Sequence, residues 1–153
     1  MINISVFSNE KAWTKKLKKK NLFFNKICKS FPKNYLFLNK KVSFSLLLSN
    51  NKNIKKFNKD FRNKNESTDI LSFPFSKKIK ISKKTYIGDI VISYDFINNP
   101  KSQSPKQFEK KLIKTFIHGF LHLLNFDHKK DKDYKKMLKE EELIFQSVIS
   151  KLN

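Results

Sequence analysis

The stretch FIHGFLHLLNFDHKK, residues 116–130, constrains the fold most strongly, because it contains all three histidines of the chain. His118 and His122 are four positions apart, so on a helix their side chains point the same way, one turn apart. His128 can approach this pair only if the helix ends and the chain turns back. Asn125 suits such an ending, since asparagine tolerates the left-handed backbone conformation that terminates helices. The stretch therefore predicts a helix, a tight reversal and three imidazoles that meet.

Three neutral imidazoles at one centre match the ligand preferences of zinc, and they leave the fourth tetrahedral position for water or substrate. We expect one Zn²⁺ ion per chain, held by His118, His122 and His128. Gly119 agrees with this view, because a glycine inside a helix costs about 1 kcal/mol relative to alanine and indicates that another segment approaches closely. The alternative is three ordinary histidines, two on a polar helix face and one in a loop.

The spacing H-x3-H-x5-H equals that of the metzincin proteases, whose motif is H-E-x-x-H-x-x-G-x-x-H. Gly119 stands where those proteases carry the glutamate that acts as general base. Peptide hydrolysis would therefore lack its proton acceptor. The pattern predicts a metzincin-like metal helix and disfavours a protease.

Apolar periodicity divides the chain into strands and helices. A chain of 153 residues without repeats or linkers suits one domain, residues 1–153. Ser104 followed by Pro105 is a helix start signal. Strands and helices that are interleaved rather than strictly alternating indicate an α+β or a mixed α/β sandwich around a four-stranded sheet. Of these we expect the α+β fold, a single domain with a four-stranded mixed sheet packed by helices. Strands are expected at 2–7, 42–49, 68–75 and 88–94, helices at 11–29, 53–63, 105–125 and 132–152, and an exposed lysine-rich connection at 76–86.

The formal net charge is +21, from 34 basic and 13 acidic residues. Such a charge favours a polyanionic partner, nucleic acid before membrane, because neutralised phosphates release counterions. The alternative is codon bias, since lysine, asparagine, isoleucine and phenylalanine all have AU-rich codons. Against that background the rare residues are informative: Arg62 is the only arginine, and Gly88 and Gly119 are the only glycines.

The cysteine count and the hydropathy pattern bear on the compartment. Cys28 is the single cysteine, which excludes an internal disulfide and indicates a reducing environment. The N-terminus lacks an apolar signal core, and no 18 apolar residues run together. We expect a cytoplasmic protein with no signal peptide and no membrane partner.

Three blocks of the sequence carry a resemblance to a known family. HGFLHLLNFDH (118–128) resembles the H-G-x-L-H-L-x-G-[YF]-D-H signature of the YbeY family, bacterial zinc endoribonucleases implicated in ribosomal RNA maturation. Asn125 replaces its second glycine. FRNKNESTDILSFPF (61–75) is similar to the family segment R-x-K-x-x-P-T-D-V-L-S-F-P, with Ser67 in place of proline, and IGDIVIS (87–93) is similar to L-G-D-I-V-I-S. The resemblance covers about residues 55–150 and includes all three rare residues.

The resemblance implies a metal-dependent endoribonuclease specific for single strands. It would act in maturation of the 16S rRNA 3′ end and in ribosome quality control, with ribosomal RNA and the small ribosomal subunit as partners. His118, His122 and His128 would bind zinc, and Arg62 would hold a phosphate through its bidentate guanidinium, which lysine does not offer. The alternative for Arg62 is a surface salt bridge. Asp127 could orient His128 or assist a water at the metal.

Two other functions share part of this pattern. A non-catalytic, ribosome-associated assembly factor would use the metal structurally and the positive charge for RNA affinity, and it would explain the missing general base. A metal-dependent hydrolase of another substrate would share the histidines but would not need a charge of +21.

Overall fold

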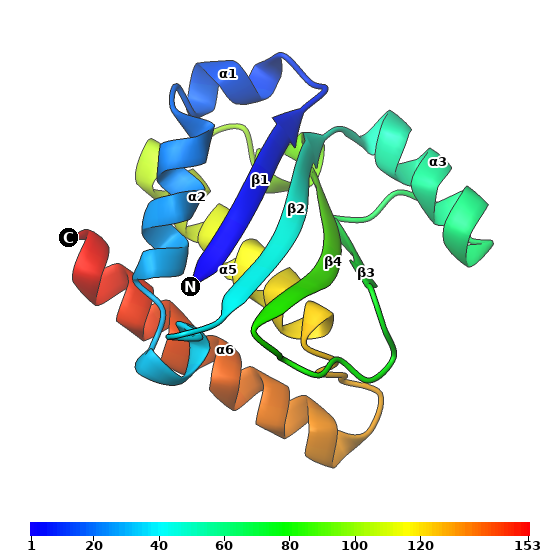
Figure 1. Cartoon of the computed structure of the whole chain (residues 1–153). Helices are drawn as coiled ribbons and strands as arrows, with labels where there is room; N and C mark the ends of the chain where they lie inside the picture. Colours follow the sequence, from blue (N-terminus) through cyan, green and yellow to red (C-terminus); the bar gives the residue numbers. More distant parts are fainter.

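The computed structural model describes residues 1–153. Helices lie on both faces of one sheet (Figure 1). The chain order alternates short helices with strands in the first two thirds and ends in two long helices. The elements are β1 Ile2–Ser8, α1 Ala12–Lys16, α2 Lys20–Lys29, a 3₁₀ turn Lys33–Tyr35, β2 Lys41–Ser49, α3 Asn51–Arg62, β3 Ile70–Pro74, β4 Lys84–Ser93, α4 Tyr94–Ile97, α5 Pro105–Leu123 and α6 Asp131–Leu152.

The sheet has the order β1-β2-β4-β3. β1 pairs with β2 and β2 with β4 in parallel, whereas β3 runs antiparallel to β4 and forms one edge. The expected α+β fold with a four-stranded mixed sheet is therefore confirmed. None of the helices has the length and the apolar character needed to cross a membrane.

One face of the sheet carries the main core, and α5 lies across it behind the strands in Figure 1. Phe116 and Phe120 of α5 pack against Phe44 of β2, with ring centroids 6.0 and 5.7 Å apart. Burying one such side chain contributes roughly 1.5–3 kcal/mol. α6 adds Met137 and Val148 to the same core. This packing fixes α5, the helix that carries two of the histidines, against the sheet.

The other face of the sheet is covered only in part, by α3. Ile54 of this helix packs on Leu71 and Val91 and forms a second, smaller apolar cluster. Asn50 caps the helix, since its side chain accepts a hydrogen bond from the backbone N–H of Asn53. The remainder of this face is open.

The prediction of one helix over 11–29 is wrong, because the structure has two, α1 and α2. Leu17 has an extended backbone (φ −127°, ψ 91°) and separates them. Like charges at helical spacing destabilise a continuous helix, and the break falls within the lysine-rich run 15–20. Trp13, fully buried, holds α1 in place by donating from Nε1 to the carbonyl of Ser49 at 2.8 Å.

β4 begins at Lys84, four residues before the strand that the sequence predicted. A bulge at Gly88 makes the longer strand possible, since the pairing with β2 shifts register between Ser43 and Phe44. Gly88 has φ +137°, a conformation that side chains disfavour. The bulge places Tyr86 and Asp89 on the same, open face of the sheet. The short helix α4 was not predicted either.

Candidate metal centre

α5 begins and ends as its sequence predicts. Ser104 Oγ accepts a hydrogen bond from the backbone N–H of Gln107, whose side chain accepts one from the backbone of Ser104, a complete capping box. Pro105 is the first helical residue. At the other end Asn125 has φ +68°, and the N–H of Phe126 donates to the carbonyl of Leu121 at 3.1 Å. This is the left-handed helix ending that allows the chain to double back.

The reversal brings the three histidine rings together. Ring centroids lie 4.6 Å apart for His118 and His122, 5.0 Å for His122 and His128, and 5.6 Å for His118 and His128. One nitrogen from each ring lies within 4.8 Å of the other two, so the group could hold a metal ion. The convergence predicted from the spacing is confirmed.

The Nδ1 atoms of His118 and His122, which point away from the other histidine rings, form hydrogen bonds with acceptors. His118 Nδ1 lies 2.5 Å from Glu141 Oε1, and His122 Nδ1 lies 2.9 Å from the carbonyl of Phe126. A carboxylate and a carbonyl both accept, so each Nδ1 carries a proton and each Nε2 presents a lone pair. These two Nε2 atoms lie only 3.0 Å apart. Two lone pairs that face each other at this distance could bind one cation together.

The distances fit a tetrahedral ion. Two nitrogens bound to one zinc at about 2.0–2.1 Å lie roughly 3.3 Å apart, close to the 3.0 Å between His118 Nε2 and His122 Nε2. Burial and the neighbouring His118 lower the pKa of His122 to about 4. The ring is therefore neutral at pH 7, which is the form that binds metals.

Glu141 is the residue that the sequence did not reveal as part of this centre. It comes from α6, 23 positions after His118, and accepts the hydrogen bond of His118 Nδ1. A signal was present, since Glu141 interrupts the apolar face that Met137, Ile144 and Val148 form on this helix. An acidic residue on a buried helix face usually has a partner.

Asp127 serves the backbone of the turn. Its Oδ1 accepts a hydrogen bond from the N–H of His128 at 2.7 Å. The carboxylate thus fixes where the chain enters His128, and it binds the main chain rather than the imidazole. Asp69 is similarly local, because its Oδ1 accepts from the hydroxyl of Thr68 at 3.2 Å.

Asn125 does more than end the helix. Its side-chain Oδ1 accepts from the N–H of Ile79 at 2.6 Å, and its Nδ2 donates to the carbonyl of Ser76 at 2.9 Å. The turn that delivers His128 is thereby tied to the connection between β3 and β4. Glycine, which the family signature has here, could adopt the backbone conformation but could not form either bond.

We therefore expect Asn125→Gly to destabilise the protein by about 1–3 kcal/mol, since two hydrogen bonds are lost and one strained φ is relieved. Urea unfolding monitored by circular dichroism measures the change. Asn63→Gly is the matched control, because Asn63 also ends a helix at positive φ (56°). That substitution should be neutral or stabilising, and equal losses in both variants would contradict the role of the Asn125 side chain.

Arg62 lies at the edge of the sheet and forms no salt bridge. Its Nη2 donates to the carbonyl of Ser72 in β3 at 2.7 Å, and its guanidinium lies 5.6 Å from the ring centroid of Phe73. The hydroxyl of Ser72 donates in turn to the carbonyl of Gly119 at 3.1 Å. The single arginine is thus linked through one edge strand to the helix that carries His118.

Gly119 permits this close contact. A Cβ atom at this position would lie 2.4 Å from Ile70 Cδ1 and 3.1 Å from Ser72 Oγ. The expectation that another segment approaches the helix backbone here is confirmed, and the segment is β3.

Comparison with known proteins gives consistent matches. The model of the family described as Endoribonuclease YbeY matches residues 6–149 of this chain. A protein of that name from Pelagibacter ubique is 58% identical over 152 residues, 99% of each chain. One from Neorickettsia sennetsu is 32% identical over 137 residues, 89% of this chain and 90% of the relative.

Among solved structures, the solution structure of a Thermotoga maritima protein matches with a TM-score of 0.58 and 24% identity. The match covers 98% of this chain and 91% of that chain. At this identity the likeness supports the fold alone.

Proposed function

Because this chain belongs to the endoribonuclease YbeY family, we propose that it is a Zn²⁺-dependent enzyme that cleaves single-stranded RNA during maturation of ribosomal RNA. Residues 1–153 would form one catalytic domain, with the small ribosomal subunit as its partner. One observation carries the metal dependence: the Nε2 atoms of His118 and His122 face each other at 3.0 Å while both Nδ1 atoms are bound elsewhere.

His118, His122 and His128 would hold the ion. The chemistry that zinc supplies at such a site is polarisation of a phosphoryl oxygen and a lowered pKa of water, toward ~7. Glu141 and the carbonyl of Phe126 orient two of the rings and keep their inner nitrogens unprotonated. His128, the most exposed of the three, would complete the set from the far side of the turn.

Arg62 would hold the phosphate of the RNA. Only one of its guanidinium N–H groups has a partner in the protein, so the others can bind two phosphate oxygens together. The link through Ser72 to Gly119 supports this role, because it fixes the guanidinium relative to the histidine helix. The proposed role in maturation of ribosomal RNA, and of the 16S 3′ end in particular, rests on the family. The excess of basic residues supports binding to RNA.

The test combines metal removal with an arginine variant. The purified protein should contain about one equivalent of zinc by elemental analysis, and a chelator should abolish cleavage of single-stranded RNA until zinc is restored. Arg62→Lys should lower kcat/KM roughly 10- to 100-fold, since a bond to a charged group contributes about 1.5–3 kcal/mol.

Lys29→Ala is the control for Arg62→Lys, because Lys29 is an exposed residue of α2 and its loss lowers the charge further without touching the centre. It should cleave as wild type does. Cleavage that persists in chelator would contradict the metal-dependent mechanism. A protein that binds RNA, unfolds on chelation and never cleaves would instead be the non-catalytic assembly factor.

A further inference from the structure

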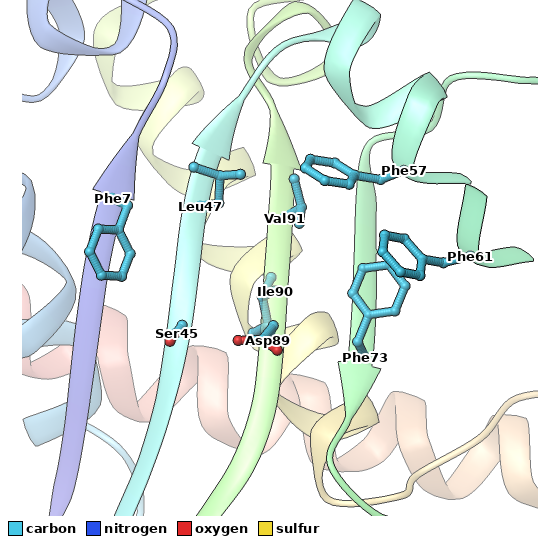
Figure 2. Close-up of a pocket in the computed structure, with 9 residues that line it drawn as sticks. All are labelled: Phe7, Ser45, Leu47, Phe57, Phe61, Phe73, Asp89, Ile90 and Val91. Carbon is cyan, nitrogen blue, oxygen red and sulfur yellow. The ribbon is translucent and has the colours of Figure 1, made fainter. Parts of the chain in front are cut away.

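The sheet face opposite α5 contains a groove of about 520 Å³, bordered on one side by α3 (Figure 2). Figure 2 shows that the lining side chains come from all four strands and from α3. Seven of the nine lining residues are hydrophobic, four of them phenylalanines. The phenylalanines are Phe7 from β1, Phe57 and Phe61 from α3, and Phe73 from β3.

The rings on this face are unusually exposed for a folded protein. Phe7 is 58% and Phe61 69% exposed, and beyond the groove Phe75 is 73% exposed. Phe61 meets Phe73 edge to face at 5.6 Å, and Phe75 meets Tyr86 in the same way at 5.9 Å. Phe61 also stacks on Phe57 at 6.3 Å, and despite these contacts Phe61 and Phe75 remain mostly exposed to a ligand. A continuous exposed apolar patch marks a surface that binds something.

Positive charge borders these rings at both ends. The α3 helix carries four exposed lysines and Arg62 against one acidic residue, and the connection between β3 and β4 with the first residue of β4 carries five more exposed lysines. No lysine of the chain forms a salt bridge. The lysines are Lys52, Lys55, Lys56 and Lys59 on α3, Lys77, Lys78, Lys80 and Lys83 on the connection, and Lys84 at the start of β4.

Asp89, the acidic residue that lines the groove, is engaged through one of its two oxygens. Asp89 Oδ1 accepts a hydrogen bond from the hydroxyl of Tyr86, which also lies 3.0 Å from Ser45 Oγ. The floor of the groove therefore offers hydroxyl and carboxylate groups to a ligand between its aromatic rings. Such groups suit the edges of nucleobases, and the rings suit their faces.

We propose that this groove is a stacking platform for the bases of single-stranded RNA, continuous with the metal centre around the edge of β3. Exposed aromatic rings between basic borders are the combination that binds single strands without sequence preference. An apolar protein partner would leave the surrounding lysines without counter-charges. The inference rests on the proposed RNA substrate. It adds the path of the RNA strand next to the bond that is cleaved.

Arg62 provides the continuity. Its guanidinium lies 5.6 Å from the ring centroid of Phe73, a residue that lines the groove, and it donates to the carbonyl of Ser72 at the edge of the sheet. The hydroxyl of Ser72 reaches through to Gly119, next to His118. A strand whose bases lie on Phe61 and Phe73 would thus present a phosphate to Arg62 as it passes from the open face to the histidines.

The experiment compares two double variants. Phe61→Leu with Phe75→Leu keeps apolar volume but removes the flat rings, whereas Phe61→Tyr with Phe75→Tyr keeps the rings. Both residues are largely exposed, so the fold should be unaffected, and circular dichroism checks this. Phe96→Leu is the control, since Phe96 is 36% exposed and lies on α4 outside the groove.

Binding of a single-stranded RNA of about 12 nucleotides is measured by fluorescence anisotropy, in chelator and at about 0.1 M salt. The leucine pair should weaken binding roughly ten-fold, and the tyrosine pair and Phe96→Leu less than about two-fold. A 2-aminopurine base in the RNA should be quenched by wild type and by the tyrosine pair but not by the leucine pair, which reports stacking directly.

Wild-type affinity and wild-type quenching in the leucine pair would overturn the inference and leave the groove to a protein partner. An equal loss in Phe96→Leu would overturn it too, because the effect would then not belong to the groove. The chelator separates this test from the proposed function. A wild-type protein that stacks RNA but cleaves none after zinc is restored would refute the nuclease and still support the platform.

Discussion

The His122→Ala variant should lose zinc and RNA cleavage together while it keeps its fold. His122 Nε2 lies 3.0 Å from His118 Nε2, so its removal would leave two of the three proposed ligands of the ion. We expect the rate to fall by about 10³-fold or more, since the lowering of the pKa of water that zinc would supply is lost. Elemental analysis and cleavage of a labelled single-stranded RNA measure the two losses.

Wild type stripped by a chelator is the matched control for His122→Ala. The two proteins should show the same residual rate, and zinc should rescue only the wild type. A variant that retains one equivalent of zinc, or that cleaves faster than stripped wild type, would contradict the role of His122.

The same residue has a pH signature in the metal-free protein. Its pKa is about 4 in the folded state, below the ordinary value of 6.5. Between these values the unfolded chain binds a proton that the folded chain does not, so stability falls as the pH drops from about 6.5 to about 4. The melting temperature of His122→Ala should depend less steeply on pH in this window.

Gly88→Ala should destabilise the protein strongly, and more than alanine at the other glycine, Gly119. A Cβ atom at Gly88 would lie 2.2 Å from the carbonyl oxygen of Phe73, a backbone atom that cannot rotate away. The backbone also has φ +137° there. Steric overlap and strain together predict a loss of about 3 kcal/mol or more in the free energy of unfolding. Urea titration measures it.

Gly119→Ala is the comparison for Gly88→Ala. Its Cβ would meet Ile70 Cδ1 at 2.4 Å, but that atom is the flexible end of a side chain, and alanine favours a helix over glycine by about 1 kcal/mol. The loss should therefore be clearly smaller. If Gly88→Ala lowers the free energy of unfolding less than Gly119→Ala does, the bulge does not constrain position 88 as the structure indicates.

The sequence predicted most of the histidine centre because the relevant physics is local. A spacing of four on a helix aligns His118 with His122, and asparagine at position 125 permits the reversal, whatever the remainder of the chain does. Glu141 could not be placed in this way. Its contact with His118 spans 23 residues and depends on how α6 lies across α5.

The strands and the order of elements were also predictable, whereas the partners of exposed side chains were not. Alternation identifies a strand but does not say which edge it occupies, so the carbonyl of Ser72 could not be foreseen as the partner of Arg62. The groove was hidden for a related reason. Phe7, Phe61 and Phe73 belong to β1, α3 and β3, and only the fold brings these elements to one face.

The edge strand β3 is protected against unwanted association. The carbonyl of Asp69 accepts from Ser93 of β4, and the N–H of Phe75 donates to Ile87 of β4. Backbone groups of an antiparallel strand point alternately toward and away from the partner strand, so those of Ser72 and Pro74 point away from β4. Proline has no N–H to offer there, and the outward carbonyl of Ser72 is already bound by Arg62. A second chain cannot extend the sheet at these positions. In a molecule rich in phenylalanine and isoleucine, Arg62 thus also makes aggregation by strand pairing at this edge less favourable.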